Sequence, residues 1–141
     1  MRMLIQPNLV RPNKHSLNFN GVVGRNGLAG VGVVAQDFRG NVLASCTEQI
    51  LYFNDVDHVE ALGALRASII VKDLGSSSVH IEGDSFTVVN LVKSDEADLS
   101  SIGSVSECVR SNLVGTQNWV IGHVKCSGNQ SGALSCQVGS Q

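Results

Sequence analysis

One carboxylate stands out by its position along the chain. The stretch SVHIEGDSFTVVNLV places Asp84 between a short strand-like segment, residues 78–83, and a second apolar segment that begins at Phe86. Asp84 can cap the helix that follows, since a carboxylate accepts from the free amides two or three residues later. Alternatively, it is a carboxylate held at the carboxyl end of a sheet, where it is available for chemistry.

A second acid lies in a segment with helical periodicity. Glu60 stands between Val59 and Ala61, so we expect its side chain to be partly buried. A half-buried acid without a metal partner tends to take up a proton. The Cys and His residues lack the spacing of zinc ligands, and no helix follows the glycines near residue 27, so the sequence indicates neither a zinc site nor a phosphate-binding loop.

The elements that must position these acids follow from hydrophobic periodicity. An alternating segment and two Val-rich segments, joined by short turns, predict an antiparallel three-stranded meander. Apolar residues spaced by three and four then predict a helix that ends at Gly75. In chain order we expect strands at 16–24, 29–37 and 42–50, a helix at 57–74, a strand at 78–83, helices at 84–93 and 94–115, a strand at 117–124 and a weak helix at 129–137. This order predicts an α/β fold, a five-stranded mixed sheet flanked by helices.

Length and composition bound the class of protein. The chain has 141 residues, 43% of them hydrophobic, which suits one globular domain. We expect an extended leader at 1–15, the domain at 16–138 and a tail at 139–141. The formal net charge of −2 does not indicate strong nonspecific binding to nucleic acid.

The same features bear on the compartment. No run of about 20 apolar residues is present, so we expect no membrane span. The first residues have no apolar core of the length that a signal peptide needs, and the four cysteines form no CxxC pair. We therefore expect reduced thiols and an intracellular protein, cytoplasmic or nuclear.

Four segments in order carry a resemblance to a known family. SLNFNG, AGVGVVAQDFRGNVL, HVEALGALRASIIVKDLGSSSVHIEGDS and HVKCSGNQSGAL resemble the ribonuclease H fold. More narrowly, the chain is similar to plant ribonuclease H-like domains related to retrotransposon reverse transcriptases (ribonuclease H type 1), over about residues 12–138. The resemblance implies four carboxylates that hold two divalent ions, Mg²⁺ or Mn²⁺, and cut the RNA strand of an RNA–DNA hybrid.

The family positions map onto this sequence one by one. The resemblance places the helical carboxylate at Glu60 and the carboxylate after the fourth strand at Asp84. Asn20 stands where the family has the first-strand Asp, and Ala133 stands where it has the last Asp. His123 matches a histidine that assists turnover in several members, although a plain surface histidine is an equally open interpretation.

Two of the four carboxylates are therefore replaced. The resemblance leaves Asn20, Glu60 and Asp84 as ligands of at most one weakly held Mg²⁺ or Mn²⁺. Of the spare acids, Glu82 is the best substitute, since strand alternation puts it on the same face as Asp84. We expect weak, salt-sensitive binding of RNA–DNA hybrid or other nucleic acid with little or no catalysis. The alternative is a pseudoenzyme that serves as a protein-interaction module or a retroelement remnant.

Overall fold

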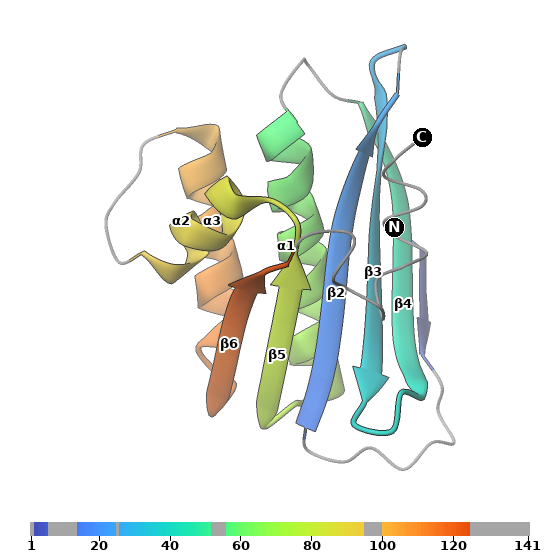
Figure 1. Ribbon diagram of the computed structural model, residues 1–141, viewed down its shortest axis with the longest axis vertical. Coiled ribbons are helices and arrows are strands. Elements are labelled where there is room, and N and C mark those ends of the chain that lie inside the picture. Colours follow the sequence, from blue (N-terminus) through green and yellow to red (C-terminus); the bar gives the residue numbers. More distant parts are fainter. Residues whose placement is uncertain (1, 6–13, 25, 52–55, 95–99, 125–141) are drawn as a thin grey trace.

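The computed structural model describes residues 2–5, 14–24, 26–51, 56–94 and 100–124. These residues form a mixed sheet with helices, as the sequence predicts (Figure 1). The five predicted strands are all present. A sixth, β1 (Arg2–Ile5), lies within the segment expected to be an extended leader and pairs antiparallel with β4 at the edge of the sheet.

The sheet has the order β1-β4-β3-β2-β5-β6. The antiparallel meander comprises β2 (Lys14–Val23), β3 (Leu28–Asp37) and β4 (Val42–Leu51). Strands β5 (Ser78–Gly83) and β6 (Asn118–His123) add in parallel next to β2. Each parallel strand is reached through helices, so their carboxyl ends meet at one edge of the sheet.

Helices α1 (Val56–Leu74) and α2 (Phe86–Lys93) pack against the sheet, and α3 (Ser101–Leu113) packs against these two helices (Figure 1). The long α1 packs on β2 and β3 and ends at Gly75, whose φ of 65° suits a glycine after a helix. None of the described helices is both long and apolar enough to cross a membrane.

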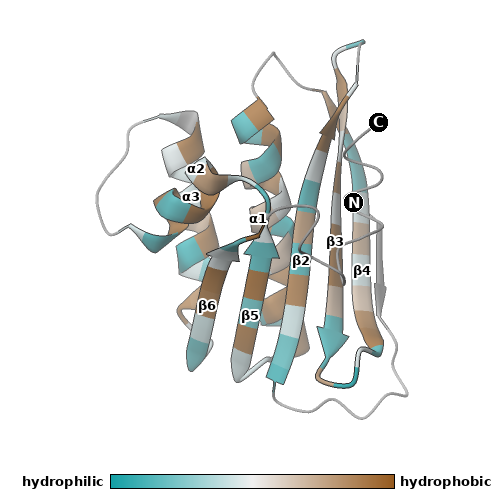
Figure 2. Ribbon diagram, in the orientation of Figure 1, coloured by the Kyte–Doolittle hydropathy of each residue, from teal (hydrophilic) through white to brown (hydrophobic). Residues whose placement is uncertain are grey.

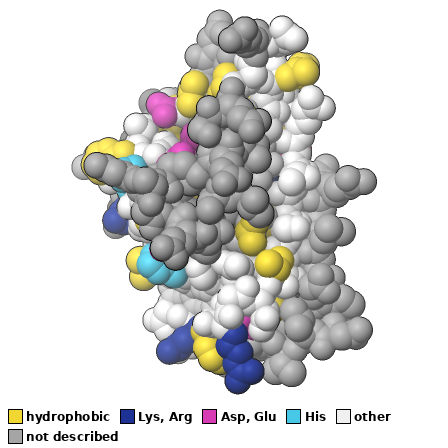
Figure 3. Space-filling model, turned by 45° about the vertical axis from the view of Figure 1, so that its right-hand side comes forward, with side chains coloured by type: hydrophobic (Ala, Val, Ile, Leu, Met, Phe, Trp, Pro, Cys, Tyr) yellow, Lys and Arg dark blue, Asp and Glu magenta, His cyan; other side chains and the backbone are white. Residues whose placement is uncertain are grey.

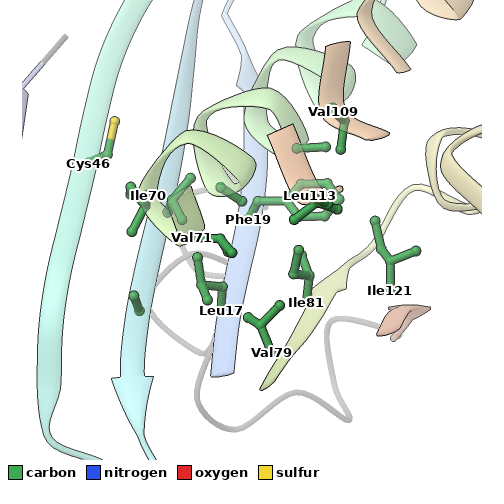
Figure 4. Packing of buried hydrophobic residues seen from close by; sticks show 14 of the residues in the cluster. Leu17, Phe19, Cys46, Ile70, Val71, Val79, Ile81, Val109, Leu113 and Ile121 are labelled. Carbon is green, nitrogen blue, oxygen red and sulfur yellow. The ribbon is translucent and has the colours of Figure 1, made fainter. Parts of the chain in front are cut away.

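The hydrophobic core lies between the sheet and the helices. Hydrophobic and hydrophilic bands alternate along β2 and β5 (Figure 2), and Leu17, Phe19 and Ile81 from these strands pack with Leu113 of α3 (Figure 4). Trp119 is partly buried against the same core. These contacts hold β2 and β5 against the helices, next to the edge of the sheet at which Glu60 and Asp84 meet.

The remaining sequence-based predictions have mixed outcomes. The helix expected from residue 84 begins at Phe86, and the helix expected from residue 94 is described only from Ser101. Cys46 is a buried free thiol and Cys108 an exposed one. The predicted helix at 129–137 and the tail at 139–141 lie outside the described residues.

Candidate carboxylate site

The candidate site lies where the carboxyl ends of β2 and β5 meet the first half of α1. The parallel register pairs Phe19 with Gly83, so Asn20 and Asp84 follow at the next position of neighbouring strands. Glu60 lies in the second turn of α1, the helix that packs on β2. Glu60 and Asp84 thus converge on this edge from α1 and from the segment after β5, and Asn20 lies on the neighbouring strand.

Glu60 is deeply buried for an acid. Only 6% of the residue is exposed, and the backbone N–H of Gly21 donates a hydrogen bond to its carboxyl group. A Cβ at Gly21 would lie 3.2 Å from Glu60 Oε1 and 2.9 Å from Val59 Cγ1, so the lack of a side chain lets the carboxyl reach the β2 backbone. Glu60 Oε2 is also buried and has no hydrogen-bond partner among the described residues.

Glu60 and Asp84 form a carboxyl pair. Burial, together with the neighbouring Asp84, raises the pKa of Glu60 to about 8. The two carboxyl groups lie within hydrogen-bonding reach, and protonated Glu60 can donate to the Asp84 carboxylate. Asp57, one turn earlier on α1, raises the pKa of Glu60 further by charge repulsion. The expectation that the half-buried acid takes up a proton agrees with this environment.

Asp84 does not cap α2. The N-cap is Ser85, whose Oγ accepts from the N–H of Val88 at 3.3 Å. The capping interpretation of Asp84 is therefore wrong, and the predicted helix start is displaced by two residues. Because Ser85 performs the capping, the exposed side chain of Asp84 is left to pair with Glu60.

His123 lies beside Asp84 rather than elsewhere on the surface. At the end of β6, its Nε2 donates to the backbone carbonyl of Asp84 at 3.1 Å. Its ring meets that of Phe86 nearly at right angles, with 5.5 Å between the ring centroids. Two rings are therefore fixed next to the carboxyl pair.

The side chain of Asn20 lies on the opposite face of the sheet from Glu60. Its neighbours Phe19 and Gly21 face α1, so strand alternation directs the Asn20 side chain to the other face of the sheet. There it is 5% exposed and lines a hollow with residues of β3 and β4, among them Gly32 and Thr47. Its role as a metal ligand stays a prediction, and Ala133 lies outside the described residues.

The spare acids do not complete the site. Glu82 lies 3.6 Å from His80, two residues earlier on β5. Its expected place beside Asp84 stays a prediction. Asp37 accepts from the backbone N–H groups of Arg39 and Asn41 in the β3–β4 turn. Asp55 lies outside the described residues.

The donor set decides how well a divalent ion fits. Among the described residues, no three His, Cys, Asp or Glu side chains lie close enough together to hold a metal ion. Glu60 and Asp84 supply two hard carboxyl groups, and the buried Glu60 Oε2 is placed to serve as a ligand atom. The described residues thus offer ligands for at most one divalent ion.

Four supporting residues were not predicted from the sequence. Gly21 donates a hydrogen bond to Glu60, Ser85 caps the start of α2, and Phe86 contacts His123. Gly83 leaves room for Phe19, since a Cβ there would lie 2.1 Å from the ring. The sequence did carry a signal for the two glycines, because each directly adjoins a predicted site residue.

Comparison with known proteins identifies the family. The sequence pattern of the family described as reverse transcriptase-like matches residues 18–137, most of the chain. The chain therefore belongs to the reverse transcriptase-like family, whose fold is that of ribonuclease H. No curated protein matches the sequence.

Solved structures confirm the fold. A ribonuclease H1 from Halobacterium salinarum NRC-1 superposes with a TM-score of 0.71 at 21% identity, covering 81% of this chain and 87% of its own. The N-terminal ribonuclease H domain of a Mycobacterium tuberculosis protein gives 0.76 at 17% identity, covering 90% and 94%. LC11 ribonuclease H1, solved in complex with RNA/DNA hybrid, gives 0.69 at 18% identity, covering 82% and 88%.

Proposed function

We propose that this chain is a nucleic-acid-binding ribonuclease H-like domain of RNA–DNA hybrid ribonuclease ancestry, with weak or no cleavage activity. The Glu60–Asp84 pair at the carboxyl edge of the sheet carries this proposal. Two acids from separate elements meet, and the resemblance assigns metal-ligand positions of the family to both of them. Membership in the family and the structure of LC11 ribonuclease H1 with RNA/DNA hybrid support nucleic acid as the partner.

The replaced residues account for the expected loss of cleavage. Asn20 carries no charge, and Ala133 has no oxygen in its side chain. Two dications held close together repel each other, and anionic ligands are needed to offset that repulsion. With two of four anions gone, the site retains ligands for a single ion.

Glu60 and Asp84 would hold that ion. Once bound, Mg²⁺ or Mn²⁺ supplies positive charge to a phosphate oxygen of the nucleic acid. Glu60 must first release its proton, since its carboxyl is neutral below a pKa of about 8. The N–H of Gly21 then stabilises the ionised carboxylate and keeps it oriented.

The test is cleavage and binding of a labelled RNA–DNA hybrid in Mg²⁺ or Mn²⁺. We expect wild type to bind weakly and to cleave slowly or not at all, and cleavage by the Asn20→Asp/Ala133→Asp variant would show that position 20 can reach the site despite the orientation of Asn20. Asp84→Asn in that variant should abolish cleavage. Efficient cleavage by wild type that is lost in Asp84→Asn would overturn the claim of weak catalysis.

Binding separates the proposal from its alternative. A pseudoenzyme that only contacts other proteins would bind neither hybrid nor single-stranded nucleic acid, and restoring both acids would not change that result. Hybrid binding by wild type, without cleavage, supports a nucleic-acid-binding domain that has lost its chemistry.

A further inference from the structure

Phe86 is an exposed aromatic ring at the edge of the carboxylate site. The residue is 63% exposed although it is large and apolar, and it lies two positions after Asp84. Val56, in the first turn of α1 and one turn before Glu60, is 54% exposed. On the face shown in Figure 3, acidic side chains lie between hydrophobic ones, with a histidine beside one of the hydrophobic groups. The acid pair thus has apolar surface close by.

The position of the Phe86 ring is fixed from two directions. Its backbone begins α2 directly after the Ser85 cap. Its ring makes an edge-to-face contact with His123, and His123 is in turn hydrogen-bonded to the Asp84 carbonyl. Because both attachments lead to the residues around Asp84, the ring is held at a set place relative to that carboxylate. A ring fixed in this way loses little conformational entropy when it binds a flat partner.

Resting on the proposed function, we propose that Phe86 is a stacking platform for an unpaired nucleobase next to the Glu60–Asp84 pair, and that His123 positions its ring. Every base offers a π face, and stacking on an aromatic side chain contributes about 1–3 kcal/mol per base. Bases inside a continuous duplex already stack on their neighbours. The platform therefore favours single strands, overhangs and junctions over blunt hybrid.

Fluorescence can report this stacking directly. Trp119 is the only tryptophan, so Trp119→Phe combined with Phe86→Trp places a single reporter at the platform. Titration with a hybrid carrying a single-stranded overhang should quench this reporter, whereas a blunt hybrid should quench it much less. The same titration of a Trp119→Phe/Phe38→Trp variant should give little quenching. Phe38 is the matched control because it is 68% exposed but lies in the β3–β4 turn, at the opposite end of β2.

Affinity provides the second measurement. Phe86→Leu should weaken overhang binding by about 5- to 150-fold, the fold-change that corresponds to one lost stack. Phe38→Leu should leave it unchanged. His123→Ala should weaken binding less than Phe86→Leu while leaving the salt dependence as in wild type. Both phenylalanines are exposed, so thermal unfolding of the variants should stay near that of wild type.

The outcomes separate this proposal from the one on which it rests. Overhang and blunt hybrid bound equally by wild type and Phe86→Leu, with no quenching at position 86, would overturn the platform and leave the nucleic-acid-binding function intact. A wild-type protein that binds none of these nucleic acids would overturn both.

Discussion

At the scale of single residues, burial decides which member of the carboxyl pair holds the proton. Glu60 is enclosed by α1 and β2, whereas Asp84 faces solvent. The charged form of a buried carboxyl loses hydration, so protonation of Glu60 costs less than its ionisation near neutral pH. A proton on Glu60 also allows a hydrogen bond to Asp84 in place of a repulsion between two anions.

This environment predicts a pH-dependent stability. The pKa of Glu60 is raised from 4.5 to about 8 in the folded chain. The folded state therefore binds more protons than the unfolded state between these values, and the free energy of unfolding falls as pH rises from about 5 to 8. A tenfold change in proton affinity corresponds to about 1.4 kcal/mol, so Glu60 contributes a few kcal/mol to this fall.

Glu60→Gln isolates this contribution, because glutamine is nearly isosteric and does not titrate. We expect the variant and wild type to have similar stability at pH 5, and the variant to be the more stable at pH 8. Urea unfolding at both pH values measures the difference. A difference between the two proteins that stays constant with pH would contradict the burial argument.

The same pair predicts stabilisation by a divalent ion. Mg²⁺ bound to Glu60 and Asp84 displaces the Glu60 proton, so its affinity should rise from pH 6 to pH 8. At a concentration ten times its Kd, the ion would add about 1.4 kcal/mol to the free energy of unfolding. Thermal unfolding with and without Mg²⁺ measures this effect, and Asp84→Asn should remove it. An equal change of Tm in the variant would locate the ion elsewhere.

At the scale of elements, the residue at which α2 begins decides whether the Asp84 carboxylate caps the helix or is available for chemistry. The sequence DSF offers two capping residues in succession, and sequence alone does not distinguish them. The structure uses Ser85, because β5 ends at Gly83 and Asp84 then turns toward α1. One residue of difference thus separates a capping carboxylate from a carboxylate available for chemistry.

Capping energies test this assignment. Ser85→Ala should reduce the free energy of unfolding by about 1 kcal/mol, because the N–H of Val88 loses its acceptor. Ser85→Asp should restore most of the loss, since Asp is an equally good N-cap. Asp84→Asn should cost less than Ser85→Ala, because Asp84 caps nothing and the amide oxygen of the asparagine can still accept the hydrogen bond of protonated Glu60. Chemical denaturation of the three variants measures these values, and a greater loss in Asp84→Asn than in Ser85→Ala would reverse the assignment.

The elements also show how far sequence patterns reach. Sequence patterns located the three strands of the meander, the two parallel strands and the helix α1, and the strand at 78–83 has the predicted bounds. The short β1 carries too few residues for a periodic signal, and the pairing that defines it involves β4, about 40 residues away. Side-chain contacts such as that between Phe86 and His123 depend on the packing of α2 against β6, and no local pattern encodes them.

At the scale of the whole molecule, charge limits how strongly the chain can hold nucleic acid. The formal net charge is −2. Two of the described cations serve the fold itself, since Arg66 pairs with Glu48 across α1 and β4, and Arg110 donates to the carbonyl of Leu91. The remaining basic residues are dispersed along the sequence, and acidic residues outnumber basic ones in the chain. Attraction to the phosphate backbone should therefore contribute little to the free energy of binding. Stacking at Phe86 should contribute a larger share of that free energy than stacking usually does.

This balance predicts a particular dependence on salt. Each neutralised phosphate adds about 0.9 to the slope of log K against log salt, so roughly three contacts would weaken binding about 40-fold between 50 and 200 mM salt. Binding of an overhang hybrid, measured by fluorescence anisotropy across this range, gives the slope. Phe86→Leu should lower the affinity at every salt concentration without changing the slope, because stacking releases no counterions. A slope that corresponds to six or more phosphates would instead reveal a basic surface formed by the fold, and electrostatic attraction would then outweigh stacking in holding the nucleic acid.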